Sequence, residues 1–206
     1  MNQLSVSSPS LRGPADHDIR DQIVAAANEH FSQYGYAKTT VSDLAKAIGF
    51  SKAYIYKFFD SKQAIGEAIC SHCLSQMIAA VEQAINVEGI SPTERFRRLV
   101  KTLIATGVSL FFNDRKLYDI AAFSASERWP SSQVYDAQIK HFVLQIVREG
   151  RELGEFERKT PLDETVDAIH LALRPFINPL LLQHNLDFVE DAPALISNLV
   201  LRSLMP

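Results

Sequence analysis

The chain has 206 residues, of which 47% are hydrophobic, and its 21 Lys and Arg residues against 24 Asp and Glu residues give a formal net charge of −3. A chain of this length buries a substantial core in one compact domain or two small ones. No stretch approaches the roughly 20 consecutive apolar residues of a membrane-spanning helix, and the N-terminus lacks the apolar core of a signal peptide. We therefore expect a soluble, cytoplasmic protein, and a content of only two cysteines fits a reducing compartment.

Residues 1–15 are rich in Ser, Pro and Gly and show no apolar periodicity, which predicts a flexible N-terminal arm. Beyond them, β-strand signals are almost absent and helical periodicity is nearly continuous, so the sequence predicts an all-α protein. The first helix is expected at about 18–33. Its buried face should carry the apolar side chains at helical spacing, which are Ile23, Ala27, Phe31 and Tyr34.

The stretch 39–62 carries the strongest local signals in the chain. Thr40 is a good helix N-cap, and Asp43 stands where a capping-box partner is expected, so a short helix begins here. Gly49 follows the helix at the place where a left-handed residue often ends one. The apolar stripe between cap and glycine falls at i, i+3, i+4 and i+7, as Val41, Leu44, Ala45 and Ile48.

A second short helix is predicted to begin at a Ser51 cap after a four-residue turn. Ile55 and either Phe58 or Phe59 should look inward, which leaves Lys52, Ala53, Tyr54, Tyr56 and Lys57 facing out. Ordinary packed helices also show glycine-centred turns and spaced aromatics, and spacing alone leaves that alternative open. Charge favours a nucleic-acid interface, because residues 38–62 hold five lysines against two aspartates, a net charge of +3.

These motifs resemble the N-terminal DNA-binding domain of the TetR/AcrR family of bacterial transcriptional repressors. The resemblance covers about 18–68, roughly a quarter of the chain. It is carried by Phe31-Ser32-Gln33-Tyr34-Gly35-Tyr36, Thr39-Thr40-Val41, Asp43-Leu44-Ala45, Gly49-Phe50-Ser51-Lys52, Tyr56, Phe59 and Ser61-Lys62. Tyr54 departs from the family pattern, in which a small residue is common at this place. The bases that this chain reads therefore cannot be copied from another member.

The resemblance implies a helix-turn-helix domain at 16–68 that binds double-stranded DNA. It implies DNA contacts from nine residues: Thr39, Thr40, Ser51, Lys52, Ala53, Tyr54, Tyr56, Lys57 and Lys62. Ala53 and Tyr54 are expected nearest the base edges in the major groove. The lysines, Tyr56 and the two threonines are expected to contact phosphates.

Downstream of the helix pair, apolar spacing predicts six further helices. They are expected at about 61–85, 91–112, 116–126, 132–153, from 160 onward, and 191–204. Pro175 and Pro179 interrupt the run that begins near residue 160. Either that helix kinks or breaks at about 171–174, or it ends at Leu173 and a new helix begins at Pro175, since proline is favoured at the first helical position.

By the same resemblance, residues 69–206 form a ligand-binding and dimerisation domain that takes a small organic molecule. Candidate cavity residues are Leu103, Phe111, Phe123, Trp129, His141, Phe142, His170 and Arg174. Aromatic residues in helices are often plain core, so that alternative stays open for each of them. The last two long helices should form the homodimer interface, with apolar surface from Leu171, Phe176, Leu180, Leu181, Leu195, Leu199 and Val200.

No motif for catalysis stands out: the chain lacks a Gly-x-Ser-x-Gly turn, a His-Glu-x-x-His pair and a glycine-rich phosphate loop, and its six histidines are scattered. We predict no enzyme activity and no cofactor. Cys70 and Cys73 share a helix face, a spacing that could supply two metal ligands, but no second Cys/His cluster supplies the other two. Buried, unreactive thiols are favoured, and no metal is predicted.

The sequence as a whole predicts a ligand-responsive repressor that binds a palindromic operator as a homodimer and is released by a small organic inducer. The alternative from a different class is a helical small-molecule binding or interaction protein without operator function.

Overall fold

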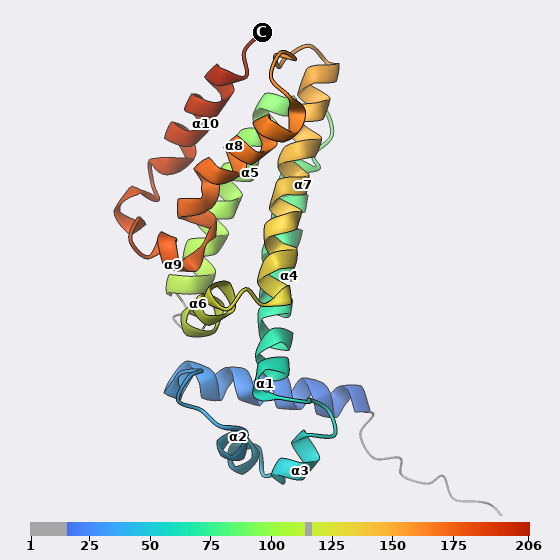
Figure 1. Ribbon diagram of the computed structural model, residues 1–206, viewed down its shortest axis with the longest axis vertical. Coiled ribbons are helices and arrows are strands. Elements are labelled where there is room, and N and C mark those ends of the chain that lie inside the picture. Colours follow the sequence, from blue (N-terminus) through green and yellow to red (C-terminus); the bar gives the residue numbers. More distant parts are fainter. Residues whose placement is uncertain (1–15, 114–116) are drawn as a thin grey trace, which may run out of the picture.

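The computed structural model describes residues 16–113 and 117–206, so the predicted N-terminal arm lies outside the described part of the chain (Figure 1). The described residues form helices and no strand, which confirms the all-α class. The helices are α1 (Asp16–Tyr34), α2 (Val41–Ile48), α3 (Lys52–Ile55), α4 (Lys62–Ile85), α5 (Pro92–Val108), the π-helical turn η1 (Ser109–Asn113), α6 (Tyr118–Ser126), α7 (Pro130–Glu152), α8 (Leu162–Ile177), α9 (Pro179–Leu182), the 3₁₀ turn η2 (Leu186–Phe188) and α10 (Ala192–Ser203).

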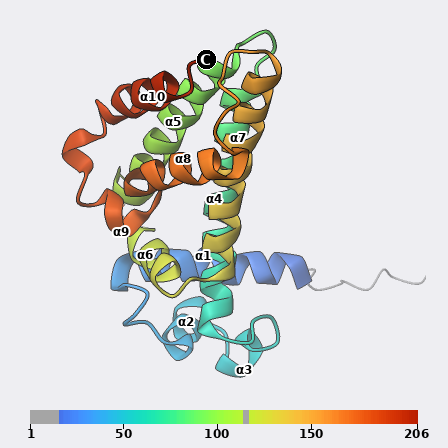
Figure 2. The same cartoon turned by 45° about the horizontal axis from the view of Figure 1, so that its top comes forward.

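Helices α1 to α3 and the first turns of α4 make a small unit that we call the head. Figures 1 and 2 show α1 lying across the foot of α4, with α2 and α3 beneath it. The head has a core of its own, because its helices turn fully buried apolar side chains toward one another: Ile23, Ala27, Leu44, Ile55 and Ile65. This core fixes the direction in which α2 and α3 face away from the rest of the molecule.

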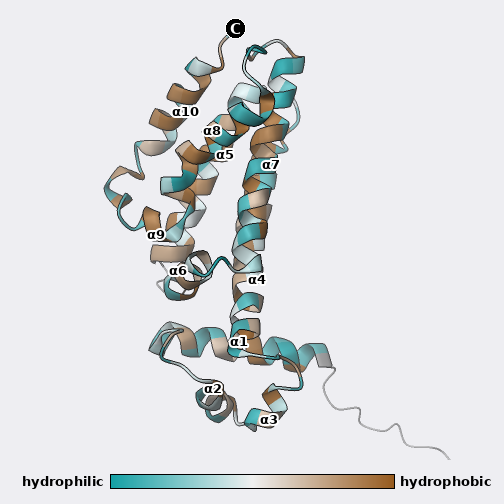
Figure 3. Cartoon of the chain, viewed as in Figure 1, coloured by the Kyte–Doolittle hydropathy of each residue, from teal (hydrophilic) through white to brown (hydrophobic). Residues whose placement is uncertain are grey.

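The remaining helices form what we call the body. Helix α4 rises out of the head and packs along α5 and α7, while α8 covers α7 and α10 covers α5. The largest fully buried side chains of the body include Phe96, Leu99, Leu103, Ile139 and Leu173. Figure 3 colours much of α10, at the edge of the body, as hydrophobic.

Helix α4 is, in the described residues, the one helix long and apolar enough to cross a membrane by length and composition, with a mean hydropathy of 1.3 over 18 residues. The expectation that no stretch comes near a membrane span was therefore too strong. In this fold α4 packs against α1, α5, α6 and α7 and buries Ile65, Ile69, Met77 and Val81 against them. A core helix of this kind passes the same test of length and composition.

Two details of the first helix differ from the prediction. The helix extends to Tyr34, whose side chain is 53% exposed rather than buried. Gly35 then takes a left-handed backbone, with φ of 83°, which turns the chain and brings Tyr36 into the core instead. The apolar period of the helix therefore stops one turn earlier than the sequence pattern indicated.

The backbone between α8 and α9 shows how Pro175 and Pro179 interrupt the helical run. Helix α8 continues through Pro175 to Ile177, so the predicted new start at Pro175 was wrong. The restart comes at Pro179, the first residue of α9, and Asn178 caps that helix by accepting a hydrogen bond at Oδ1 from the Leu180 amide at 2.9 Å. Asn178 thus sets the corner between the two helices.

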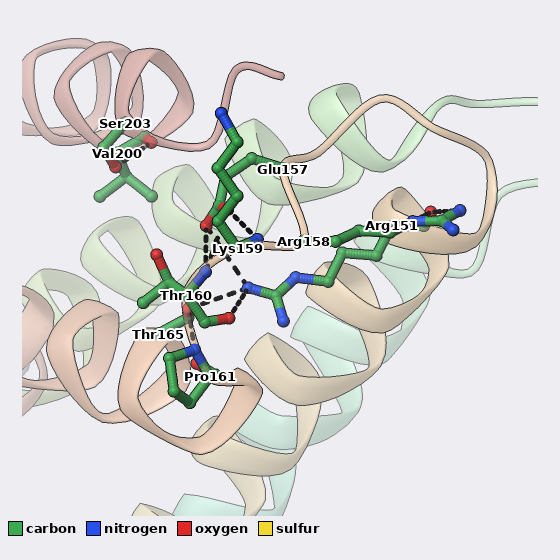
Figure 4. Close-up of polar contacts among 9 residues, drawn as sticks. All are labelled: Arg151, Glu157, Arg158, Lys159, Thr160, Pro161, Thr165, Val200 and Ser203. Carbon is green, nitrogen blue, oxygen red and sulfur yellow. Dashed lines mark hydrogen bonds and ion pairs between the residues drawn. The ribbon is translucent and has the colours of Figure 1, made fainter.

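The loop from α7 to α8 is held by Arg151 (Figure 4). Its Nη2 donates to the Thr160 carbonyl at 2.8 Å and to Thr165 Oγ1 at 3.1 Å, and lies 3.6 Å from the Glu157 carboxylate. The Glu157 amide in turn donates to the Leu204 carbonyl at 2.7 Å, just after α10. These contacts fix the C-terminal end of α10 on the body.

Candidate functional site

Both ends of helix α2 have the geometry that the sequence predicted. Asp43 Oδ2 accepts from the Thr40 amide at 2.9 Å, and Thr40 Oγ1 accepts from the Asp43 amide at 3.2 Å, which completes the capping box. The hydrogen bonds from Thr40 hold the pKa of Asp43 below its usual value, so this carboxylate stays charged at the helix start. Gly49 ends the helix in the left-handed conformation, with φ of 77°.

Helix α3 begins at the predicted cap, where Ser51 Oγ accepts from the Tyr54 amide at 3.1 Å. Ile55 and Phe59 are buried, which settles the choice between Phe58 and Phe59 in favour of Phe59. Lys52, Ala53, Tyr56 and Lys57 are exposed. The outward face of α3 is therefore available to a ligand as large as a nucleic-acid duplex.

Tyr54 is half-buried, because its ring packs edge-on between two other aromatic rings. The ring centroids of Phe50 and Phe58 lie 5.1 and 5.4 Å from that of Tyr54. The ammonium group of Lys57 lies 5.5 Å from the Tyr54 ring, and that of Lys52 lies 5.8 Å from the Tyr56 ring. Each of these two tyrosine rings thus has a lysine ammonium group close to it, and the neighbouring aromatic rings restrict the motion of the Tyr54 ring.

Two of the predicted phosphate contacts have other partners. Lys62 Nζ donates to the carbonyls of Tyr36 at 3.0 Å and Thr39 at 3.1 Å, and burial lowers the pKa of this lysine. Thr39 is buried, and its Oγ1 donates to the Gly35 carbonyl at 2.9 Å. Both side chains hold the loop from α1 to α2 against the start of α4, and Lys62 uses two of its three ammonium protons in doing so. We therefore withdraw Thr39 as a phosphate contact, whereas the contact of Lys62 with a phosphate stays a prediction.

Arg20 is a positioning residue of the head that the sequence did not reveal. Its Nη1 donates to the Phe58 carbonyl at 2.9 Å, and its guanidinium carbon lies 4.2 Å from the Phe59 ring centroid. The contact ties α1 to the segment that follows α3 and so fixes how α3 projects. Its partners lie 38 and 39 residues away along the chain, and no local pattern marks such a pair.

Head and body meet at an aromatic group that we call the junction cluster, made of Tyr36, Phe123 and Trp129. The ring centroids lie 5.1 Å apart for Tyr36 and Phe123, 5.4 Å for Tyr36 and Trp129, and 5.7 Å for Phe123 and Trp129. Trp129 fits against Gly66 of α4, where an added Cβ would stand 2.8 Å from its ring. Nearby, Glu67 Oε2 accepts from the Ser131 amide at 3.1 Å. The start of α7 is therefore attached to both the head and α4.

A cavity of about 150 Å³ lies just above the junction, between α4, α6, α7 and α8. Its apolar wall is formed by Leu74, Phe111, Ala121, Ala125, Ile177 and Pro179. Its polar wall is formed by Ser124, Arg128, Ser132, Gln133, Tyr135, Asp136, Arg174 and Asn178. A wide, more open groove of about 840 Å³ runs along α4 and the first turns of α7.

The structure brings two of the eight predicted ligand residues to the wall of this cavity and a third into contact with that wall. Phe111 and Arg174 line the cavity. His170 lies behind the wall and contacts the lining residue Asp136, whose Oδ1 lies 2.9 Å from His170 Nε2. The hydrogen bond from His170 is the main reason that the pKa of Asp136 lies below its usual value.

The other five predicted ligand residues lie elsewhere. Phe123 and Trp129 belong to the junction cluster, Leu103 and Phe142 are core, and His141 is exposed on α7. On α7 the cavity side falls at Tyr135 and Asp136, which stand six residues before His141 and Phe142. Six residues at 3.6 per turn bring a side chain to about a third of a circle from the starting face, so His141 and Phe142 point away from the cavity.

Both cysteines are free thiols that the surrounding helices shield at least in part from solvent. Cys70 is buried with its Sγ 3.8 Å from the Ile120 carbonyl oxygen, and burial raises its pKa to about 12. Cys73 is partly buried, and burial raises its pKa as well. A thiol with a raised pKa is a poor nucleophile and a poor metal ligand at neutral pH. In the described ranges, no group of three or more His, Cys, Asp or Glu residues is placed to hold a metal ion.

A capped helix-turn-helix with an exposed basic face, carried on a larger helical body, is the architecture of a DNA-binding transcriptional regulator. The family model of bacterial regulatory proteins, tetR family, matches residues 23–69, and the model of the tetracyclin repressor-like C-terminal domain matches residues 92–194. The chain belongs to the tetR family of bacterial regulatory proteins.

Individual proteins agree with this assignment. The HTH-type transcriptional repressor DhaR of Mycobacterium sp. (strain GP1) is 22% identical over 151 residues, which cover 72% of this chain and 75% of the relative. The regulator IcaR of Staphylococcus aureus (strain Newman), a negative transcriptional regulator of the biofilm operon icaADBC, is 37% identical over 59 residues, 29% of this chain and 32% of the relative. The transcriptional regulator FadR from Bacillus subtilis, solved in complex with stearoyl-CoA, shares the fold with a TM-score of 0.67 and 20% identity over 89% of this chain and 98% of that chain.

Proposed function

We propose that this protein is a repressor that binds a palindromic operator as a homodimer and leaves it when a small organic inducer binds. The observation that carries the proposal is the capped helix pair with Lys52, Ala53, Tyr56 and Lys57 exposed on one side. The repressor names of DhaR and IcaR support repression over activation. Binding operator DNA also requires a cytoplasmic protein. In this proposal residues 16–68 bind DNA, and residues 69–206 bind the inducer and the second subunit.

The proposed DNA contacts divide into two kinds. Ala53 and Tyr54 meet base edges in the major groove, where the Tyr54 ring can cover a thymine methyl group or its hydroxyl can bond a base. Lys52, Tyr56 and Lys57, together with Thr40 and Ser51 at the two helix starts, meet phosphates. The ring packing of Tyr54 between Phe50 and Phe58 supports a reading role, since a held side chain loses little freedom on binding.

This division predicts different consequences for Tyr54 and Lys57. Tyr54→Ala should change which operator is preferred, and Tyr54→Phe, which keeps the ring packing, should separate a hydroxyl bond from a methyl contact. Lys57→Ala should weaken binding to all sequences alike and flatten the slope of log affinity against log salt by about one. Fluorescence anisotropy on single-base operator variants at three salt concentrations measures both effects. The division is wrong if Lys57→Ala changes the sequence preference and Tyr54→Ala does not.

The homodimer is proposed to form through α8 and α10, on the apolar side chains that these helices expose. Leu171 of α8 and Leu195 and Leu199 of α10 are each at least 60% exposed. Isolated exposed leucines are common, but a group on adjacent helices at one edge of a body marks an interface. Of the other predicted interface residues, Phe176 and Val200 are buried within the subunit and act as core, while Leu180 and Leu181 lie on the short helix α9.

The response to an inducer is proposed to run from the cavity to the head through the junction cluster. The cavity and the cluster share α6 and the residues between α6 and α7. A ligand that binds better when the two heads have a spacing unsuited to DNA shifts the population toward that state. The stearoyl-CoA complex of FadR supports a ligand site in a body of this fold.

The cysteines are predicted to play no part in this response. A Cys70→Ala, Cys73→Ala variant should bind operator and be released by inducer with unchanged midpoints, because both thiols are buried or half-buried with raised pKa values. Titration of operator release for the variant and the parent protein tests this, alongside zinc and peroxide as trial effectors. Release by zinc or peroxide that disappeared in the double variant would make the cysteine pair the sensor.

A further inference from the structure

Tyr135, one of the residues that line the cavity beside the junction, has a buried hydrogen-bond donor without an acceptor. Tyr135 is 7% exposed, and among the described residues its hydroxyl has no hydrogen-bond partner. Burial raises the pKa of this phenol above its ordinary value, so the hydroxyl keeps its proton and remains a donor. Buried polar groups in native structures nearly always have partners, and an orphan on a residue that lines a cavity points to an acceptor supplied from outside the chain.

Two arginines share the wall with Tyr135. Arg174 comes from α8 and Arg128 from the residues just before α7, and within the described part of the chain neither guanidinium forms an ion pair. Asp136 is the one acidic residue in the wall, and its Oδ1 is already engaged by His170 at 2.9 Å. The Oδ1 atom of Asn178 is likewise engaged, by the Leu180 amide. The two arginines outnumber the single carboxylate of Asp136, so the polar side of the cavity has a surplus of positive charge.

The backbone conformation of Arg128 is a further sign that its side chain has a role at the cavity. Arg128 has φ of 54° and is, in the described residues, the one non-glycine residue in the left-handed region. Such a conformation is costly for a long side chain, and asparagine or glycine would adopt it more readily. An arginine kept there is consistent with a role for its guanidinium at the mouth of the cavity.

Opposite these groups the wall is apolar, with Leu74, Phe111 and Ile177 as its largest members. A cavity of about 150 Å³ lined in this way accommodates a molecule of about the size of benzene. An occupant must therefore combine a small apolar part with a group that accepts several hydrogen bonds and carries negative charge.

We propose that the cavity binds a small carboxylic acid, whose carboxylate meets Arg174, Arg128 and the Tyr135 hydroxyl and whose ring or short chain lies against Phe111, Leu74 and Ile177. The proposal rests on the ligand-responsive function above and names the chemical class of its inducer. Guanidinium and phenol donors match a carboxylate in charge and geometry, whereas an ammonium group would be repelled by both arginines.

Benzoate, benzamide and benzylamine test the class of ligand, because they share a ring and differ in charge. Isothermal titration of the full-length protein should show benzoate binding at least about tenfold more tightly than either other compound, since hydrogen bonds to a charged group are the stronger ones. Straight-chain carboxylates of four to eight carbons extend the series in size. Equal or tighter binding of benzamide or benzylamine, or no binding by any carboxylate of the two series, would overturn the proposal.

Variants test the residues. Arg174→Gln and Tyr135→Phe should each reduce benzoate affinity by about tenfold or more and leave benzamide affinity nearly unchanged. Arg148→Gln, at an exposed arginine of α7 outside the cavity wall, is the matched control and should change neither. Melting temperatures without ligand confirm that each variant is folded, and Arg174→Lys provides a second substitution that keeps the charge. Unchanged benzoate affinity in both Arg174→Gln and Tyr135→Phe would contradict the assignment.

Operator binding separates this proposal from the proposed function. If carboxylates bind as expected but leave operator affinity unchanged, the cavity assignment stands and its role in induction is wrong. If the protein binds its operator but no carboxylate binds the cavity, the repressor function stands and the ligand class is wrong.

Discussion

A Leu195→Glu, Leu199→Glu variant is expected to be a folded monomer whose affinity for the full operator is lower by about 100-fold or more. The two side chains are 63% and 70% exposed on one face of α10, so glutamates there should cost the subunit fold little. Two charges buried against a partner without counter-charges oppose association by several kcal/mol, and one head alone loses the gain from two linked half-sites. Sedimentation equilibrium and anisotropy with the full operator measure the two losses.

Leu153→Glu is the matched control for that variant. Leu153 is 65% exposed, but it lies at the end of α7 and outside the proposed interface. This substitution should leave both the dimer and operator affinity unchanged. A stable monomer of the α10 variant that bound the full operator with undiminished affinity would show that α10 is not what joins the two heads.

Trp129→Ala is expected to destabilise the protein by about 3–5 kcal/mol, the usual range for removing a large buried aromatic side chain. Trp129 is 3% exposed and fills the space above Gly66, with Tyr36 of the head against its ring. Its loss leaves a cavity where the head is attached to the body. We therefore also expect saturating inducer to release the operator less completely in this variant, because a weaker contact between body and head transmits less of the change in the body to the head. Urea denaturation and operator-release titrations measure the two effects.

Phe123→Ala and Gly66→Ala complete this test. Phe123 is 38% exposed, so its removal should cost clearly less stability than that of Trp129. Gly66→Ala introduces a Cβ 2.8 Å from the Trp129 ring and should destabilise by about 1–3 kcal/mol through overpacking. If Trp129→Ala unfolded at the same urea concentration as the parent and responded fully to inducer, the junction cluster would not be the connection between body and head.

The sequence predicted the parts of the head that are decided within a few residues of chain. The capping box of Thr40 and Asp43 spans three residues, and the left-handed Gly49 and the Ser51 cap are equally local. Their hydrogen bonds are made between near neighbours, so residue type and spacing are enough to predict them. The same holds for the buried Ile55, whose place follows from the helical period.

Roles decided by distant contacts were beyond the sequence. The charge and position of Lys62 predict a phosphate contact, but only the structure shows that its ammonium group also donates to carbonyls 23 and 26 residues earlier in the chain. Arg20 and Trp129 likewise owe their roles to partners dozens of residues away. A pattern of residue types carries no information about such pairs until the helices are packed.

The lining of the cavity was also only partly predictable from the sequence. Phe111 and Arg174 were predicted from their chemistry, whereas Tyr135 and Arg128 were not. Tyr135 stands on α7 one to two turns before the predicted His141 and Phe142, and only the packing of α7 on α4 and α8 decides which turn faces the cavity. Arg128 depends on a left-handed backbone that residue type would have argued against.

The most direct test of the account is a footprint of the protein on its own upstream intergenic DNA, combined with the binding stoichiometry. The account predicts protection of a palindrome with half-sites about one helical turn apart, two chains per site, and loss of protection when Lys52 and Lys57 are both replaced by alanine. Binding to that DNA no tighter than to unrelated sequence, or a full site occupied by a single chain, would contradict the account.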